Sequence, residues 1–375
     1  MNSRSILLAG AMTVAPWSAA LSADAVFAPE QEPAEYVRVC DTFGEGFFYI
    51  PGTETCLQIS GEIYYQIGAT SDDGVTDTPN YFGYTRGWNK NPKATVNFDA
   101  RTSTEWGVLQ SFIAFEADWD GQGDGPVVAN QAWLSLGGLR MGYSESTWAD
   151  SIHDLAVTGT HSDGGLWYGD QNRAFIQYNF GGSQGLFGTL ALEDDGQEGE
   201  GYMPDVVALI GYHQSWGGVW ARLGYDESYG DPAIPFEKDG FGVSAGLQVN
   251  IPGIEGSSFR VIGYYADGDH VYGTGSSFAG VTGYAGNAEW SVLASYQHQF
   301  SAKLSGSVGF QYFNDFYVGG TDAGTGLDGY TAEASLVWLP VENFEVRGEG
   351  GMALRFPLAL LPDPRRQSGR EHTHY

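Results

Sequence analysis

Apolar and polar residues alternate one by one along many short stretches of the chain. The stretch 57–66 reads LQISGEIYYQ, in which Leu57, Ile59 and Ile63 alternate with polar side chains. The same period of two recurs at 94–101, 109–119, 173–180, 241–250 and 303–312. This is the period of a β-strand with one apolar and one polar face. The pattern therefore predicts an all-β chain built from consecutive antiparallel strands.

The connections between the predicted strands alternate between short and long. Short turns are predicted near 106–108, 137–138, 181–185, 215–218, 250–256, 299–302 and 339–342. Long, acidic, glycine-rich loops are predicted near 70–92, 120–128, 146–171, 194–204, 227–239, 267–287 and 315–328. Outer-membrane barrels have tight turns at one end and longer loops at the other, whereas a β-sandwich needs strands that cross between two sheets. The alternation favours a barrel.

Composition agrees with a β-barrel. The 375 residues include 55 Gly, 22 Tyr, 21 Phe and 11 Trp, and only 17 Lys plus Arg. The mean hydropathy of −0.23 does not exclude a membrane protein, because a transmembrane barrel places its apolar residues at alternate positions. Aromatic residues near the predicted strand ends suggest the two girdles of such a barrel: Trp106, Trp119, Phe180, Trp216, Trp220, Phe300 and Trp338.

The first residues have the pattern of a secretory signal peptide. Arg4 supplies the charged region, an apolar run extends from Ile6 to Leu21, and small residues follow. We assign residues 1–22 to this signal, although cleavage after Ala25 fits the sequence equally well. No later stretch approaches 18 consecutive apolar residues, so any membrane span is expected to be a barrel.

The chain has two cysteines, Cys40 and Cys56, within the N-terminal segment 23–56. In an exported chain this pair suggests a disulfide, which would contribute roughly 3 kcal/mol in the chain-entropy model. A metal pair or a catalytic thiol is the alternative. Neither is favoured, because no His lies nearby and the CxxC spacing is absent.

Three stretches resemble the alphaproteobacterial (rhizobial-type) general porins. They read CDTFGEGFFYIPGTETCLQISG at 40–61, ATVNFDARTSTEWG at 94–107 and LPVENFEVR at 339–347. The resemblance implies a 16-stranded antiparallel transmembrane β-barrel, here over residues 57–360, with a constriction loop folded inward between its fifth and sixth strands. It also implies a homotrimer in the outer membrane, in contact with membrane lipid and lipopolysaccharide.

The C-terminal sequence departs from this pattern. From Asn343 the chain reads NFEVRGEGGMALRFPLALLPDPRRQSGREHTHY, which is short for two strands with a loop between them. Either the ending typical of the family is replaced here, or a short turn at Gly348–Gly351 joins two abbreviated strands. Residues 361–375 are rich in Pro and in basic residues, and we expect them to be disordered.

The expected constriction loop, residues 143–172, carries four acidic residues: Asp150, Asp154, Asp163 and Asp170. Five arginines on polar strand faces are predicted to line the wall: Arg101, Arg140, Arg173, Arg222 and Arg260. Opposed acidic and basic linings would create a transverse field that favours small polar solutes. The alternative is an outer surface loop with solvated arginines inside the barrel.

These observations predict a porin that lets small hydrophilic solutes and ions diffuse passively, with a mild preference for cations. An exported β-rich surface binding protein is the first alternative, and an outer-membrane barrel enzyme is the second. The seven histidines show no metal-binding spacing, and GTGLDG at 324–329 opens no helix. Acidic runs such as Asp267 and Asp269 are interpreted as solvated loops rather than Ca²⁺ sites. We expect no cofactor, no metal and no nucleic-acid partner.

Overall fold

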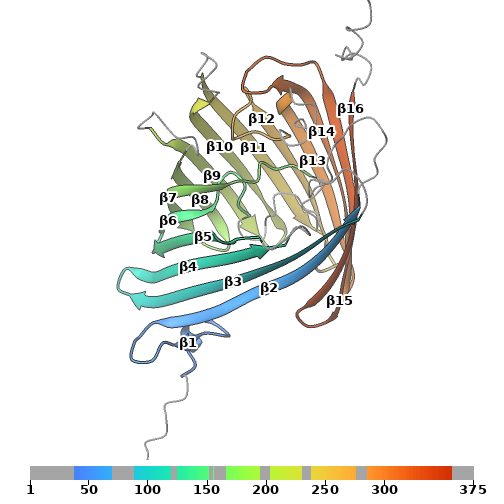
Figure 1. The fold of residues 1–375 in the computed structure, drawn as a ribbon. Helices are drawn as coiled ribbons and strands as arrows, with labels where there is room; N and C mark the ends of the chain where they lie inside the picture. Colours follow the sequence, from blue (N-terminus) through green and yellow to red (C-terminus); the bar gives the residue numbers. More distant parts are fainter. Residues whose placement is uncertain are drawn as a thin grey trace, which may run out of the picture.

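The computed structural model describes residues 38–69, 88–119, 125–151, 155, 166–194, 203–229, 238–275 and 285–356. These residues form a single curved antiparallel sheet (Figure 1). Its strands are β1 (Phe48–Tyr49), β2 (Cys56–Ala69), β3 (Trp88–Thr104), β4 (Gly107–Asp118), β5 (Val127–Leu136), β6 (Leu139–Glu145), β7 (Asn172–Gly181), β8 (Gly185–Glu193), β9 (Asp205–Gln214), β10 (Gly217–Tyr229), β11 (Lys238–Asn250), β12 (Ser258–Ala266), β13 (Ala285–Ser301), β14 (Leu304–Val318), β15 (Asp328–Val341) and β16 (Phe344–Phe356). One short 3-10 helix, η1 (Asp41–Phe43), precedes β1.

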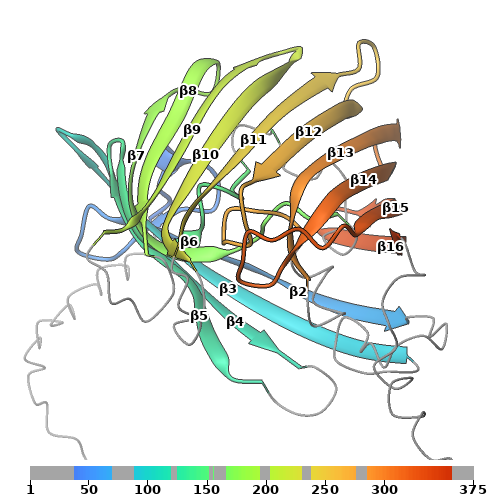
Figure 2. The same ribbon diagram turned by 90° about the horizontal axis from the view of Figure 1, so that it is seen from above.

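Each strand pairs with the next in sequence, so the order in the sheet is the order in the chain. The prediction of an all-β, 16-stranded antiparallel barrel is confirmed, although β1 contributes only two residues and pairs only with the start of β2. Seen from above, the strands curve around a central space (Figure 2). No helix among the described residues is long and apolar enough to cross a membrane.

The predicted alternation of short and long connections is also confirmed. Short turns follow β3, β5, β7, β9, β11, β13 and β15, at the positions expected from the sequence. The longer connections follow β2, β4, β6, β8, β10, β12 and β14. All short turns therefore lie at one end of the barrel and all long connections at the other. We refer to these as the short-turn end and the long-loop end.

The outer face of the sheet is apolar and the inner face is largely polar, as expected from the alternation of apolar and polar residues along the strands. Large apolar side chains are exposed on the outer face, among them Ile59, Ile63, Ile176, Leu190, Ile210, Leu223, Val308 and Leu336. The inner face can be followed from strand to strand by side-chain contacts. Gln110 on β4 donates to Asp99 on β3 at 3.0 Å, Phe112 stacks on Trp133 of β5, and Arg140 of β6 lies over Trp133. Polar and aromatic groups thus line the interior.

Exposed aromatic residues form a girdle at each end of the barrel. At the short-turn end these are Trp106, Phe180, Trp216, Phe300, Trp338 and Phe344, and at the long-loop end Tyr143, Tyr225, Phe241, Tyr265 and Trp290. On the β9–β10 hairpin, Tyr225 lies nine positions after Trp216, which corresponds to about 30 Å of strand at about 3.3 Å per residue. With a tilt of about 40°, this spans about 23 Å, close to the apolar band of about 25 Å in known barrels.

One predicted girdle residue is placed differently. Trp220 is 5% exposed and points into the barrel, where it joins the interior apolar cluster. It lies four residues after Trp216, so the two positions share a strand parity. However, Trp216 lies in the turn at 215–216, before the first residue of β10, so the alternation along β10 does not extend to it. Proximity to a strand end was therefore an insufficient criterion for membrane exposure.

The C-terminal part of the sheet corrects one expectation. β16 runs without interruption through Gly348–Gly351, paired with β15 along its length, so the idea of a turn that joins two abbreviated strands is wrong. The turn lies before it, at Asn343, which has a φ of 59°.

Because strands from β2 to β16 alternate in direction, β2 and β16 run the same way. Among the described residues, the sheet order ends at β16 without returning to β2.

Candidate functional site

We call the connection between β6 and β7, residues 146–171, the inner loop. Its described parts, residues 146–151, 155 and 166–171, enter the interior of the barrel. Its residues Trp148, Leu155 and Leu166 are at most 3% exposed. They pack against inward-facing side chains of the barrel wall: Phe187, Ala191, Val207, Leu209, Trp220, Ile262, Tyr264 and Leu293. The wall residues come from β8, β9, β10, β12 and β13. The predicted inward-folded loop is therefore present, and it is held by an apolar cluster inside the barrel.

Hydrogen bonds fix the start of the inner loop to β8. The buried carboxylate of Glu193 accepts the Ser146 hydroxyl at 2.7 Å and the Thr147 N–H at 3.0 Å. Ser146 N–H also donates to the carbonyl of Gln171 at 2.9 Å, which joins the two ends of the loop. Hydrogen bonds to a charged acceptor are stronger than neutral ones. Glu193 is fully buried, so these donors hold the loop in a fixed position.

The returning part of the loop reaches a distant strand. Trp167 N–H donates to the amide oxygen of Gln311 on β14 at 2.7 Å, and the amide nitrogen of Gln311 donates back to the Trp167 carbonyl at 2.8 Å. The Trp167 side chain packs against a second apolar cluster that contains Phe313 and Phe316. The inner loop therefore leaves β6, contacts β14 and returns to β7.

One predicted acidic residue lies beside two predicted arginines. The backbone carbonyl of Asp150 accepts a hydrogen bond from the guanidinium of Arg222. Burial raises the pKa of the Asp150 carboxyl, while the charges of Arg140 and Arg222 act in the opposite direction. The structure thus brings together an acidic loop residue and basic wall residues from β6 and β10.

Arg140 is held by aromatic rings as well as by charge. Its guanidinium lies 4.2 Å from the ring centre of Trp133 and 5.1 Å from that of Phe175, and it donates to the Ser144 hydroxyl at 3.1 Å. Cations over aromatic faces are stabilised by the ring quadrupole. The rings and Ser144 therefore keep the Arg140 charge at a defined position on the wall.

The remaining predicted residues are distributed elsewhere. Arg173 donates to Gln171 at the end of the inner loop, and Arg260 donates to Gln248 on the neighbouring strand at 2.7 Å. Asp170 is exposed. Asp154 and Asp163 lie outside the described residues. Of the nine predicted site residues, Asp150, Arg140 and Arg222 form a group around the start of the loop.

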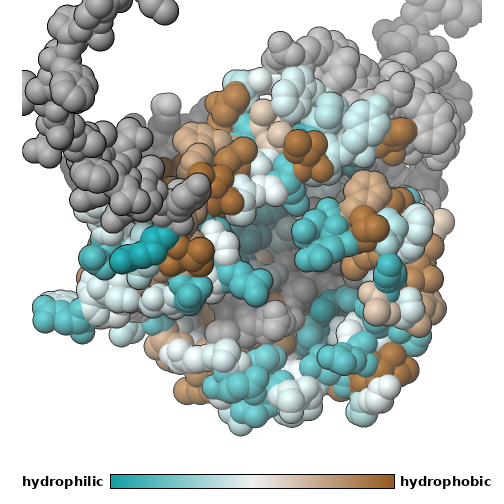
Figure 3. Space-filling model, turned by 90° about the horizontal axis from the view of Figure 1, so that it is seen from below, coloured by the Kyte–Doolittle hydropathy of each residue, from teal (hydrophilic) through white to brown (hydrophobic). Residues whose placement is uncertain are grey.

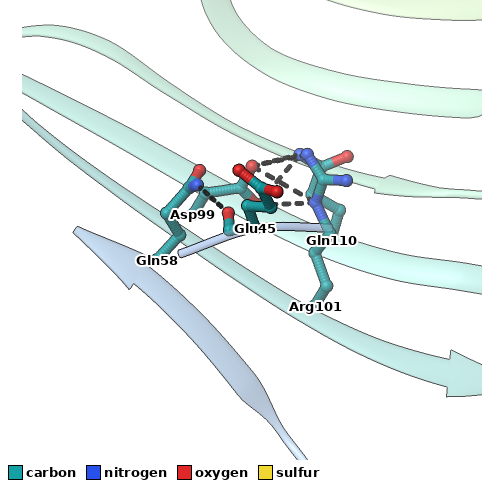
Figure 4. Close-up of polar contacts among 5 residues, drawn as sticks. All are labelled: Glu45, Gln58, Asp99, Arg101 and Gln110. Atoms are coloured by element: carbon teal, nitrogen blue, oxygen red, sulfur yellow. Dashed lines mark hydrogen bonds and ion pairs between the residues drawn. The ribbon is translucent and has the colours of Figure 1, made fainter. Parts of the chain in front are cut away.

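Arg101 belongs to a separate group near the short-turn end. Its guanidinium pairs with Asp99 at 2.6 Å, and Gln110 donates to the same carboxylate (Figure 4). The guanidinium also lies 4.9 Å from the ring centre of Phe47. Beside them, Gln58 on β2 donates to the backbone carbonyl of Glu45 at 2.9 Å. Arg101 is thus engaged by the N-terminal residues rather than by the inner loop.

These contacts place the N-terminal hairpin, residues 38–55, on the inner face of β2 and β3. The predicted Cys40–Cys56 disulfide is present, with a Cα–Cα distance of 6.0 Å. Both cysteines are buried in a small cluster with Phe47. The hairpin lies on the lower side of the molecule in Figure 1. From below, the molecule is hollowed at its centre and hydrophilic residues border much of the hollow (Figure 3).

Several interior residues were not singled out in the sequence. Glu193, Asp205, Tyr272 and Gln311 are each fully buried. Glu193, Asp205 and Gln311 are strand residues that bond loop residues inside the barrel, and Tyr272 is the loop residue that bonds Asp205. The available signal was parity, the alternation of inward and outward positions along a strand. Glu193 and Gln311 occupy the polar face of their strands. Parity shows that a residue faces inward but does not identify the loop that it meets. No group of three or more potential metal ligands occurs in the described parts of the chain.

The fold and the sequence together define the class of protein. A barrel with an apolar outer band, aromatic girdles and a loop folded inside has the architecture of an outer-membrane channel. The sequence matches the porin subfamily over residues 24–351, so the chain belongs to this family. It is an outer-membrane protein of a family of channels, and the barrel-enzyme alternative is set aside on that basis.

Particular relatives agree with this assignment. Porin Omp2b of Brucella canis is 34% identical over 255 residues, which cover 60% of this chain and 66% of the relative. Porin Omp2a of Brucella ovis is 34% identical over 256 residues, which cover 60% of this chain and 71% of the relative. The matched part thus spans about two thirds of the curated relatives.

Two solved structures share the fold. The outer membrane channel DcaP of Acinetobacter baumannii has a TM-score of 0.56 at 16% identity, covering 80% of this chain and 91% of that one. An anion-selective porin from Comamonas acidovorans has a TM-score of 0.56 at 9% identity, covering 80% of this chain and 89% of that one. At these identities the likeness concerns the fold alone.

Proposed function

We propose that this chain forms a water-filled pore in the outer membrane, through which small hydrophilic solutes and ions diffuse passively. The observation that carries the proposal is the inner loop, which lies inside a barrel with an apolar outer face and a partly polar inner face. A loop in this position narrows the water-filled path without closing the barrel wall. Family membership supports the same function.

We further propose that the narrow region lies beside the start of the inner loop, where the loop is attached to the wall that carries Arg140 and Arg222. Asp150 supplies negative charge on the loop side, and the two arginines supply positive charge on the wall side. Fixed charges of opposite sign across a narrow path orient water and favour small polar solutes over apolar ones. Asp154, Asp163 and Asp170 would add negative charge on the loop side.

We propose a mild preference for cations over anions. The chain has a formal net charge of −29 at pH 7, and a field of that sign attracts cations into a polar path. Arg101 adds little positive charge to the path because it is paired with Asp99. Arg173 and Arg260 remain candidate wall residues that would limit the preference.

The proposed assembly is a homotrimer, as the resemblance to general porins implies. The outer apolar band would contact membrane lipid, and the long-loop end would face lipopolysaccharide. A surface binding protein, the remaining alternative, has no need of two aromatic girdles on an exposed apolar band. Heat-modifiable migration on gels, with cross-linking in outer-membrane preparations, tests both the barrel and the trimer.

Swelling of proteoliposomes in sugars of increasing size tests the pore directly. We expect rapid swelling with small sugars, a rate that falls steadily with sugar size, and no saturation with concentration. Vesicles that contain heat-denatured protein serve as the control. Saturable uptake of one sugar, or no swelling at all, would contradict a general diffusion pore.

A further inference from the structure

A second segment also enters the barrel, from the connection between β12 and β13. We call residues 267–275 the second inner loop. Its central residue, Tyr272, is fully buried and lies against two glycines of the inner wall. Gly224 on β10 and Gly242 on β11 are direct partners in the sheet register. A methyl group at Gly224 would overlap the Tyr272 ring, and one at Gly242 would overlap the Tyr272 backbone. The wall is therefore shaped to receive Tyr272.

The second inner loop is firmly attached to the barrel. Asp267 accepts the Phe241 N–H of β11 at 2.8 Å, and Asp269 accepts the N–H groups of Asn287 and Gly320 at 2.7 Å each. The Thr274 hydroxyl lies 2.9 Å from that of Ser291 on β13. These bonds tie the loop to β11, to β13 and to the connection between β14 and β15, so its backbone is a fixed platform for Tyr272.

Tyr272 links this platform to the start of the inner loop. Its hydroxyl donates to Asp205 at 2.9 Å and lies 3.4 Å from Glu193. Glu193 and Asp205 are neighbours in the register of β8 and β9. Glu193 is the carboxylate that holds Ser146 and Thr147. A single buried hydrogen-bond network therefore joins Tyr272 to the first residues of the inner loop.

Apolar packing and a backbone contact join the two loops as well. The Tyr272 ring lies edge-on to the indole of Trp148, with ring centres 5.9 Å apart. At the other end of the inner loop, Gln171 donates to the carbonyl of Val271 at 2.9 Å. The second inner loop thus contacts both the beginning and the end of the inner loop.

We propose that the second inner loop sets the position of the inner loop, with Tyr272 as its main positioning residue. The inference rests on the pore proposed above and deepens it: the width and steadiness of the narrow path depend on two loops rather than one. Buried polar networks hold their members rigidly when each is satisfied, and lose that rigidity when a member is removed. Loss of Tyr272 would remove one of the contacts that hold the beginning of the inner loop, so its position would fluctuate more.

Single-channel recordings in planar bilayers test this inference. Tyr272→Ala removes the ring and the hydroxyl, and we expect a larger conductance with frequent brief closures. Tyr272→Phe keeps the ring, so we expect a conductance near that of the wild type with more closures. Tyr312→Phe is the matched control, because its hydroxyl donates to Asp328 at 2.9 Å away from both loops. We expect this control to behave as the wild type.

The outcomes separate the two proposals. If the wild type forms no channel, the pore itself is overturned, and this inference with it. If the wild type conducts and both Tyr272 variants match it, only the inference is overturned. Heat-modifiable migration shows whether each variant is folded. Should Tyr272→Ala fail to fold, Tyr272→Phe decides alone: wild-type traces would overturn the inference, and added closures would support it.

Discussion

Gln311 holds the backbone of Trp167 by two hydrogen bonds. The Trp167 N–H donates to the Gln311 amide oxygen at 2.7 Å, and the Gln311 amide nitrogen donates to the Trp167 carbonyl at 2.8 Å. The two residues are 144 positions apart in the sequence. Gln311 is fully buried on β14, so a side chain of the wall fixes the returning part of the inner loop. This pair ties the loop to a strand remote from both of the strands that it connects.

Replacing Gln311 with Leu should release this part of the loop. The change leaves a buried N–H and carbonyl without these partners, at a cost of about 1–3 kcal/mol for each unsatisfied group. We expect a folded barrel with a noisier and larger single-channel conductance. Gln297→Leu is the control, since its amide reaches only the Gly256 carbonyl at 3.3 Å. Equal noise in the two variants would mean that Gln311 does not hold the loop.

The Asp150 carboxyl should give the ion preference a dependence on pH. Burial raises its pKa above the usual value of about 3.9, so it loses its charge earlier as the pH falls, while Arg140 and Arg222 remain positive. We expect the cation preference, measured as a reversal potential under a KCl gradient, to decrease as the pH falls and the Asp150 carboxyl becomes protonated. Because the native carboxyl binds its proton more tightly than the unfolded one, its protonation also favours the native state as the pH falls.

Asp150→Asn removes the titrating group. We expect a weaker cation preference at neutral pH and a smaller change on acidification than in the wild type. Glu255→Gln in the exposed turn between β11 and β12 is the matched control, and its reversal potentials should follow those of the wild type. An Asp150→Asn profile that coincides with the wild-type profile would remove this residue from the pore.

The two faces of β2 should respond differently to a new charge. Ile63 is 85% exposed on the outer face, and its neighbour Glu62 has the opposite parity. An arginine that faces lipid near the middle of a bilayer costs about 2–4 kcal/mol. We therefore expect Ile63→Arg, but not Glu62→Arg, to reduce the unfolding free energy measured by urea titration in lipid vesicles. Equal losses would show that the assigned faces are wrong.

The N-terminal hairpin should depend on its disulfide. In the chain-entropy model, closing a loop of this size contributes roughly 3 kcal/mol. We expect the double variant Cys40→Ser, Cys56→Ser to become sensitive to protease within residues 38–55, while the strands stay resistant. Release of the hairpin also removes Phe47 from Arg101. Identical digestion patterns with and without the disulfide would show that the cluster around Phe47 holds the hairpin unaided.

Much of the fold could be predicted from the sequence, because the relevant signals are local. Alternation over eight to ten residues identifies a strand and its faces, and Gly and Asp clusters identify the connections. The continuous β16 was missed because Gly348–Gly351 resembles a turn. Pairing with β15 outweighs the low strand propensity of these glycines.

The site was predicted less completely, because it depends on contacts between distant segments. Parity indicated that Arg101 and Arg222 face inward. Because both occupy the same kind of position in the sequence, parity could not show which segment each of them contacts. Only the fold shows that Arg222 meets the inner loop and that Arg101 meets the N-terminal hairpin. Asp267 and Asp269 of the second inner loop were interpreted as solvated, whereas both accept backbone N–H groups of neighbouring segments. The position of Tyr272 gave no signal in the sequence, since its main contacts are with glycines and carboxylates on other strands.

The most direct test of the account is the single-channel conductance of the wild type beside that of a chain in which residues 150–169 are replaced by a short Gly-Ser linker. The replacement removes most of the inner loop and leaves all strands intact. We predict discrete, stable openings for the wild type and larger openings for the shortened chain. Equal conductance in the two folded proteins would place the loop outside the conducting path and contradict the account.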